Sequence, residues 1–268
     1  MRILIGSPCG GGQVTVQYML SLLDTYNQAA KHKQEIAQAI IQQSPGFDAK
    51  NPQHMQGLQV TMAQHTYDIG IYTLAGESLL ARGRNHIAST ALRQGWDRLV
   101  FIDVDEGFTW DDFKSVVSSP HMITAGVVPL KTYVDRPNSF KTSLNYLPFF
   151  EDEKYYTRAI RDLAGMERHV QGSGSHLLKV AFTGTGFMCI DSKVLMQLTE
   201  SAPHYLYPDP SNGQVQSHWG FFDGGPINAA YYSEDWALCQ KVRDLGHDII
   251  VDTRVKITHT GNETFKVG

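Results

Sequence analysis

Short apolar runs alternate along the chain with stretches in which apolar residues recur every three or four positions. A continuous apolar run bounded by turn residues is typical of a buried strand, and the three-to-four spacing is typical of an amphipathic helix. Strands that alternate with helices predict an α/β fold with a mostly parallel sheet and helices on both of its faces. The expected strands cover residues 2–5, 68–73, 99–102, 122–128, 187–190 and 248–251, and the expected helices cover 78–94, 110–117, 192–198 and 233–245.

Three regions interrupt this alternation. Helical spacing covers residues 14–23 and again 28–42, where Ser44-Pro45-Gly46 ends it, so residues 24–58 form an insertion between the first two strands. We expect the insertion to pack on the main domain or on a partner, with a homo-oligomer left open. Residues 133–174 show little periodicity, and residues 203–226 are rich in Pro, Gly and Asn, which predicts a long loop. Long ordered loops tend to carry function.

Length and composition restrict the functional classes. A chain of 268 residues with 42% hydrophobic residues is long enough for one α/β domain, and we expect a single domain over 1–268. The net charge of -4, with both signs spread along the chain, gives no basic patch of the kind that binds nucleic acid. No apolar run approaches the ~20 residues that span a membrane. The three cysteines are scattered and lack metal-site spacing, so we expect a cytoplasmic protein without disulfides.

The sharpest local feature is a pair of aspartates directly after an apolar strand. Asp103 and Asp105 follow Phe101-Ile102 with one residue between them, which places both carboxylates on the same side of an extended chain. The carboxyl ends of strands border the crevice where open α/β sheets bind ligands. Hard divalent cations prefer such paired oxygen ligands. A solvated turn, in which Asp bonds to the backbone, explains the bare pattern equally simply.

Two further constellations lie near the C-terminus. Ser233-Glu234-Asp235 opens a helix, where the acids either complement the helix dipole or accept a proton from an incoming hydroxyl. His259 follows the last expected strand. A single histidine is more often a packed or surface residue than a ligand, although imidazole is a common ligand beside carboxylates.

Taken in order, these motifs resemble GT-A glycosyltransferases, in particular family 2-like members and related viral and phage enzymes. The likeness rests on the strand that ends in Asp-x-Asp and on the preceding Ala81-Arg82-Gly83-Arg84-Asn85. It also rests on the Ser-Glu-Asp helix, followed by Leu-Gly, a strand and His259-Thr260-Gly261. It covers residues 2–12, 78–128 and 180–261. The insertion and residues 133–174 depart from the family pattern.

The resemblance implies a GT-A-like, Rossmann-related fold. Its first half, 1–128, would bind the nucleotide-sugar, and its second half, 129–268, would bind the acceptor and catalyse. It implies transfer of a hexose from a nucleotide-diphosphate sugar, such as UDP-glucose, to a saccharide or other hydroxyl acceptor. The donor would be bound with Mn²⁺, or alternatively Mg²⁺. With Asp235 as a direct base opposite the leaving diphosphate, a single displacement would invert the anomeric carbon.

The same resemblance gives individual residues their expected roles. Ser7 and Pro8 would line the uridine pocket, Arg84 would face the nucleotide or its phosphates, and Asp103 would lie near ribose and metal. Asp105 and His259 would bind the metal, Gly184 and Gly186 would bring a loop close to the sugar, and Asp235 would be the catalytic base beside Glu234. For the glycines, a tight turn is an equally simple explanation.

Two other functions fit parts of the pattern. Haloacid-dehalogenase-like phosphatases also carry Asp-x-Asp after an apolar strand, with the first aspartate, here Asp103, as nucleophile. Their motif usually lies near the N-terminus, whereas this one lies near the middle of the chain. A non-catalytic sugar-binding module would instead use the aromatic residues Tyr205, Tyr207 and Trp219 to stack on sugar rings, although the same residues could simply cover the core.

Overall fold

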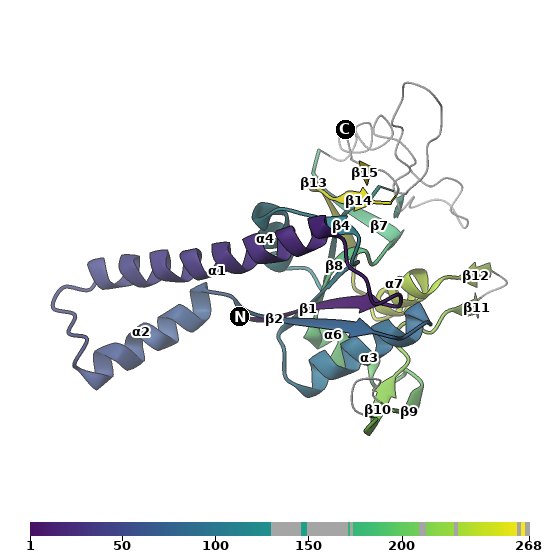
Figure 1. Cartoon of the computed structure of the whole chain (residues 1–268), viewed down its shortest axis with the longest axis horizontal. Helices are drawn as coiled ribbons and strands as arrows, with labels where there is room; N and C mark the ends of the chain where they lie inside the picture. Colours follow the sequence, from purple (N-terminus) through teal and green to yellow (C-terminus); the bar gives the residue numbers. More distant parts are fainter. Residues whose placement is uncertain are drawn as a thin grey trace.

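A central eight-stranded sheet organises the protein in the computed structural model (Figure 1). The structure describes residues 1–129, 146–148, 171, 174–208, 213–227, 230–261 and 264–265. The strand order is β2-β1-β3-β8-β5-β13-β7-β6. The strands are β1 (Arg2–Cys9), β2 (Asp68–Ala75), β3 (Arg98–Ile102), β5 (Ile123–Val127), β6 (Tyr146–Pro148), β7 (Leu177–Thr183), β8 (Phe187–Asp191) and β13 (Ile249–Lys256).

Six of the eight strands run in the same direction. β1 is parallel to β2 and β3, and β5 is parallel to β13, whereas β8 runs antiparallel between β3 and β5 and β7 runs antiparallel between β13 and β6. The predicted α/β class with a mostly parallel sheet is therefore confirmed. β3, whose residues 99–102 are continuously apolar, has a parallel neighbour in β1 and an antiparallel neighbour in β8. Burial on both faces makes a strand continuously apolar whatever the direction of its neighbours.

Helices cover both faces of the sheet, as predicted. On one face α3 (Leu80–Arg93), α6 (Ser192–Leu198) and α7 (Glu234–Asp244) contribute side chains to one buried apolar cluster. On the other face α1 (Val16–Gln42) and α4 (Trp110–Val117) contribute to a second cluster. Each helix buries one apolar side, which is what amphipathic spacing provides. α7 ends before Gly246, whose φ of 83° is the left-handed conformation of a helix C-terminus.

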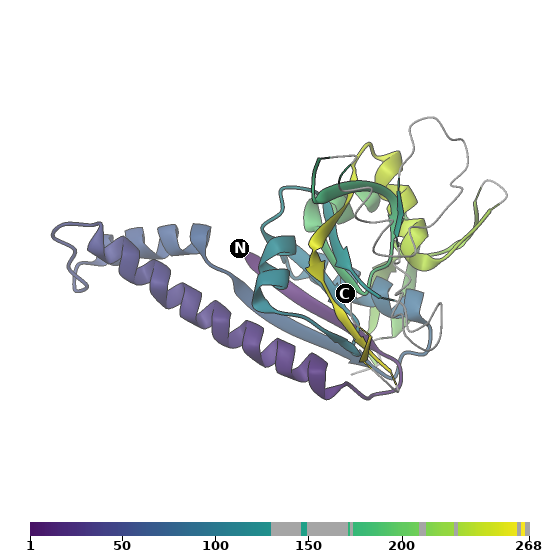
Figure 2. The same cartoon turned by 90° about the horizontal axis from the view of Figure 1, so that it is seen from above.

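The insertion after β1 is a helical hairpin that extends from the body of the protein (Figures 1 and 2). The two expected helical stretches at 14–23 and 28–42 are one continuous helix, α1, because no residue between them breaks the helix. α2 (Pro52–His65), which the apolar pattern did not predict, returns along α1 after its N-cap Asn51. α2 has no buried residue, so its weak apolar pattern reflects its exposed position. No helix among the described residues is long and apolar enough to cross a membrane.

The described residues between 203 and 226 form short strands where a long loop was expected. β9 (His204–Pro208) and β10 (Val215–Trp219) form an antiparallel hairpin, and β11 (Gly225–Ile227) pairs with β12 (Ala230–Tyr232). The side chain of Glu77 holds the hairpin to the body, because it accepts hydrogen bonds from Arg82 at 2.7 Å and from the hydroxyl of Tyr207. The loop prediction was wrong for these described residues, because strands of three to five residues are too short to give a clear apolar pattern.

A small second sheet carries one wall of the site described below. β4 (Glu106–Gly107) pairs with β14 (Thr258–Thr260), and β14 pairs with β15 (Thr264–Phe265). In this register His259 lies opposite Glu106. A C-terminal histidine is thereby placed beside the turn that follows β3. The main sheet combines strands from both sides of residue 128, and the proposed division into a 1–128 and a 129–268 half stays a prediction.

Candidate active site

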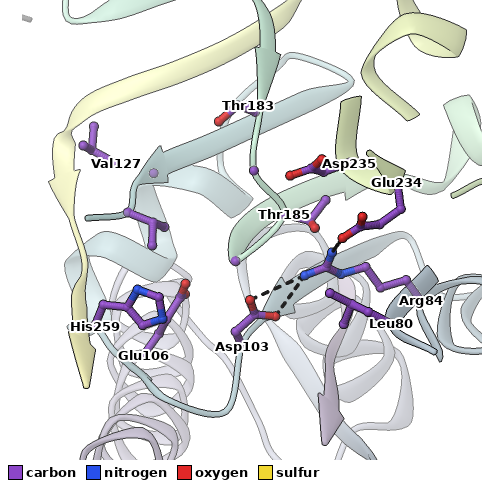
Figure 3. Close-up of a pocket in the computed structure, with 14 residues that line it drawn as sticks. Leu80, Arg84, Asp103, Glu106, Val127, Thr183, Thr185, Glu234, Asp235 and His259 are labelled. Carbon is purple, nitrogen blue, oxygen red and sulfur yellow. Dashed lines mark hydrogen bonds and ion pairs between the residues drawn. The ribbon is translucent and has the colours of Figure 1, made fainter. Parts of the chain in front are cut away.

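Several of the predicted residues line one cavity of about 190 Å³ (Figure 3). Its walls come from the turn after β3, the start of α3, the end of β5, residues 183–186, the start of α7 and β14. Asp103, Arg84, Gly184, Gly186, Glu234, Asp235 and His259 are among its lining residues. The cavity lies where β3 ends, which is the edge at which open α/β sheets bind ligands.

A buried arginine links two carboxylates of the cavity that are far apart along the chain. Arg84 is only 3% exposed, and its Nη1 lies 2.6 Å from Oε1 of Glu234 while its Nη2 lies 3.1 Å from Oδ1 of Asp103. A planar guanidinium that is always charged suits such a double contact. The sequence analysis expected Arg84 to face the nucleotide, which stays a prediction. In the structure its two terminal nitrogens already bind carboxylates from segments 19 and 150 residues away along the chain.

Asp105 and His259 form the second charged group. The Nε2 atom of His259 lies 3.3 Å from Oδ1 of Asp105, and its Nδ1 lies 2.8 Å from the carbonyl oxygen of Pro129. A carbonyl only accepts hydrogen bonds, so Nδ1 carries a proton and Nε2 of a neutral ring directs a lone pair at the carboxylate. Two acceptors at this distance need a proton or a cation between them. The donor chemistry, one imidazole and one carboxylate with the other ring nitrogen anchored to a carbonyl, therefore fits a divalent metal ion.

Asp103 does not join Asp105 and His259 in a three-ligand cluster. Among the described residues, no group of three or more His, Cys, Asp or Glu side chains is arranged to hold a metal ion. Asp103 is directed to Arg84 instead, and its backbone N–H donates to the carbonyl of Gly186 at 2.9 Å. Asp103, Asp105 and His259 as a metal-binding set therefore stay a prediction. The structure brings Asp105 and His259 together but not Asp103.

Asp235 occupies the wall of the cavity across from His259 (Figure 3). Its Oδ1 accepts hydrogen bonds from the hydroxyl of Ser233 and, at 2.8 Å, from the backbone N–H of Trp236. Burial raises the pKa of Asp235 above its usual value, against the lowering effect of the Ser233 hydrogen bond. The nearby charge of Glu234 raises this pKa further, and Arg84 lowers it. A half-buried carboxylate with increased proton affinity is a suitable general base.

The cavity also contains residues that the sequence analysis did not identify. Glu106 is 1% exposed and lies so close to Gly186 that a Cβ at that glycine would be 2.1 Å from Oε1. Thr185 is also 1% exposed, and its hydroxyl has no hydrogen-bond partner among the described residues. The only available signals were an acid directly after Asp105 and a threonine between two glycines. Neither distinguishes a cavity residue from a turn residue.

Ser7 and Pro8 lie at the end of β1 but do not line the described cavity. Ser7 is fully buried, and its Oγ accepts a hydrogen bond from the hydroxyl of Tyr18 at 2.6 Å. Pro8 lies close to Gly83, where an added Cβ would be 3.7 Å from the Cβ of the proline. Their expected contact with uridine stays a prediction.

Comparison with known proteins gave structural neighbours only. The sequence matches no family model and no curated protein. The fold is similar to that of the protein A197 from STIV, with 13% identity, a TM-score of 0.47, and coverage of 97% of this chain and 86% of that one. The match to TarS 1-349 from S. aureus has 12% identity and a TM-score of 0.36, and it covers 94% of this chain and 58% of TarS 1-349. The match to GalNAc-T7, solved with UDP, GalNAc and Mn²⁺, has 8% identity and a TM-score of 0.45, and it covers 97% of this chain and 44% of GalNAc-T7. This chain thus spans about half the length of the last two proteins.

Proposed function

We propose that this protein is a metal-dependent glycosyltransferase that moves a hexose from a UDP-sugar to a hydroxyl acceptor with inversion. The observation that carries the proposal is that a candidate proton acceptor and a candidate metal-binding pair lie on different sides of one cavity. A half-buried carboxylate with raised pKa, Asp235, lies on one wall, and a carboxylate–imidazole pair, Asp105 and His259, lies on or beside the opposite wall. A displacement needs a proton acceptor on one side of the reacting carbon and charge neutralisation for the leaving group on the other.

Asp105 and His259 would hold the metal ion. When bound, a divalent ion supplies neutralisation of the negative charge that develops on a leaving diphosphate. The protein fixes the ring orientation of His259 through the carbonyl of Pro129, so Nε2 is presented toward Asp105. Mn²⁺ suits this mixed nitrogen and oxygen set better than Mg²⁺, which prefers oxygen ligands and water.

Asp235 would take the proton of the acceptor hydroxyl. Both of its recorded hydrogen bonds end on Oδ1, which leaves Oδ2 as the acceptor atom among the described contacts. Glu234 is a poorer candidate for the base, because its carboxylate is 2.6 Å from Arg84. We therefore assign proton transfer to Asp235, and to Glu234 the task of holding Arg84 in place.

The test combines donor binding with turnover. A thermal-shift screen of UDP-hexoses, with and without Mn²⁺, should show stabilisation that requires both components. Asp235→Asn should keep this shift and lose turnover, measured as UDP release in the presence of saccharide acceptors. Asp244→Asn, at the other end of α7, is the matched control and should keep both. Full turnover in excess EDTA, or an unaltered rate for Asp235→Asn, would contradict the proposal.

The phosphatase alternative has weaker support from the geometry. Both carboxylate oxygens of Asp103 lie within 3.4 Å of Nη2 of Arg84, which holds the group in an ion pair rather than leaving it free for attack on phosphorus. Trapping of Asp103 by beryllofluoride would favour the phosphatase. Binding of free oligosaccharide without nucleotide or metal, together with no turnover, would favour the sugar-binding module.

A further inference from the structure

The outward face of α1 is an apolar surface that none of the described residues covers. The opposite face packs on the body through Tyr18, Leu22 and Ala29 and, further along, on α2. In Figures 1 and 2, α1 runs along one edge of the molecule with the sheet and α2 on its other side. Large apolar residues on the outward face are 42–75% exposed; they are Val16, Met19, Leu20, Leu23 and Tyr26.

The outward face has the spacing of a two-helix seam. Steps of four and three residues alternate without interruption over the whole helix, which is the pattern by which one helix packs along another. Two of the eight positions are polar, and polar residues within such a seam select one register at a cost in stability. The seam consists of Val16, Leu20, Leu23, Asn27, Ala30, Gln34, Ala37 and Ile41.

We propose that this face binds the same face of a second copy of the chain, with the two α1 helices antiparallel. In one antiparallel register, large seam residues of one copy meet small or complementary residues of the other, which is how two helices interdigitate. The seam pairs are Leu20 with Ala37, Asn27 with Ala30, Leu23 with Gln34 and Val16 with Ile41, each formed twice by the two-fold symmetry.

The residues that flank the seam agree with the same register. Asp24 of one copy would face Lys31 of the other, which pairs opposite charges. On the other flank, Tyr26 would face Lys33, which suits a cation–π contact. The parallel arrangement places Met19 beside Asp24 and forms no opposite-charge pair. The self-complementary charges therefore favour the antiparallel pairing over the parallel one.

Charge favours a second copy as the occupant, and the area of the surface limits how tightly that copy can bind. The hairpin of residues 16–65 contains Lys31, Lys33 and Lys50 against Asp24, Glu35 and Asp48, so it has no net charge to attract an anionic membrane or nucleic acid. At 1.5 Å per residue the 27 residues of α1 span about 40 Å, and a helix ~10 Å wide gives a footprint on the order of 400 Å² per chain. Two such surfaces bury about 800 Å² in total, which is below the ~1,200–2,000 Å² of stable specific interfaces and in the range of transient ones, so the dimer should be weak and concentration-dependent.

Sedimentation at increasing protein concentration tests the pairing. The wild-type chain should dimerise, and a chain with both Leu20→Gln and Leu23→Gln should show a dimer Kd raised more than tenfold. These leucines are each 56% exposed, so the fold should survive the change. Val60→Gln on α2 removes an equally exposed apolar residue from outside the seam and should leave the Kd unchanged. A wild-type chain that stays monomeric at about 100 μM, a concentration that reveals even weak pairs, overturns the proposal.

Mixed crosslinking tests the direction. Chains with Leu20→Cys and chains with Ala37→Cys should form a disulfide only when they are mixed, because residues 20 and 37 meet only in the antiparallel register. The three native cysteines are buried and should stay silent. Crosslinking of each variant with itself indicates a parallel pair and overturns the register. Binding of the wild-type chain to vesicles, with no dimer, would show that the occupant is a lipid surface instead.

Discussion

Removal of the Arg84 side chain should destabilise the protein strongly, because it leaves two carboxylates without their cation. Breaking a buried ion pair by removing one partner costs about 3–5 kcal/mol. Arg84 is 3% exposed, but the side chains of Asp103 and Glu234 are 30% and 23% exposed, so water can rehydrate them in part. We therefore expect Arg84→Met to lower the free energy of unfolding by about 3 kcal/mol, the low end of that range.

A double-mutant cycle separates the ion pair from other effects of the substitution. Glu234→Gln alone should cost about 1–1.5 kcal/mol, because the amide oxygen still accepts from Arg84 and the arginine keeps Asp103. The double variant should cost less than the sum of the two by about 1–2 kcal/mol, since each change removes the same contact.

Urea unfolding at neutral pH measures all three variants. Lys114→Met removes a cation that is 45% exposed and paired with an 83% exposed Asp111, so it should cost at most about 1 kcal/mol and serves as control. A cost for Arg84→Met as small as that of the control, or a coupling of zero, would refute the view that Arg84 is a buried link between the two segments. Any effect of Arg84 on nucleotide affinity has to be measured at a temperature where the variant is folded.

Three further changes test other parts of the site. Asp105→Asn should abolish the effect of Mn²⁺ on donor binding, measured by calorimetry, while the melting temperature without metal stays within a few degrees of wild type. Asp235→Asn should remove a fall in stability that the wild type shows as the pH rises above the usual carboxyl pKa of 3.8, because the raised pKa means that the folded state holds this proton more tightly than the unfolded state. Parallel pH profiles for the two proteins would contradict this. Gly186→Ala should cost about 1–3 kcal/mol in unfolding experiments, because its Cβ would collide with Glu106, whereas Gly57→Ala on the exposed side of a helix should cost nothing.

The apolar pattern predicted six of the eight strands of the main sheet, and the motifs predicted several residues that line the candidate cavity, because both depend on local patterns. The boundaries of α4 and α6 agree with the apolar spacing, which is strong where a helix packs on a sheet. α2, β6 and the β9–β10 hairpin were missed because they bury little or are very short, so their apolar patterns are weak. β7 was missed as well, because Lys179 interrupts its apolar run.

The partners of the site residues could not be predicted in the same way. Nothing local to Arg84 indicates that it binds Glu234, since the two are 150 residues apart. The burial of Glu106 likewise depends on Gly186, a residue on a different strand connection. Such contacts are set by the packing of distant segments, and residue types at fixed spacing carry no information about them.

The order of strands in the main sheet has a consequence for synthesis of the protein. β8 lies between β3 and β5, and β13 lies on the other side of β5. β3 and β5 are therefore synthesised before the strand that pairs with both of them, and β5 waits for β13 on its other edge. Contacts between residues far apart along the chain slow folding, because long loops must close before the contacts form. A nascent chain that ends before residue 249 lacks a central strand and exposes the apolar edge of β5 to other chains. We expect such truncated chains to aggregate, and we expect the two halves of the chain, made separately, to fold only when they are produced together.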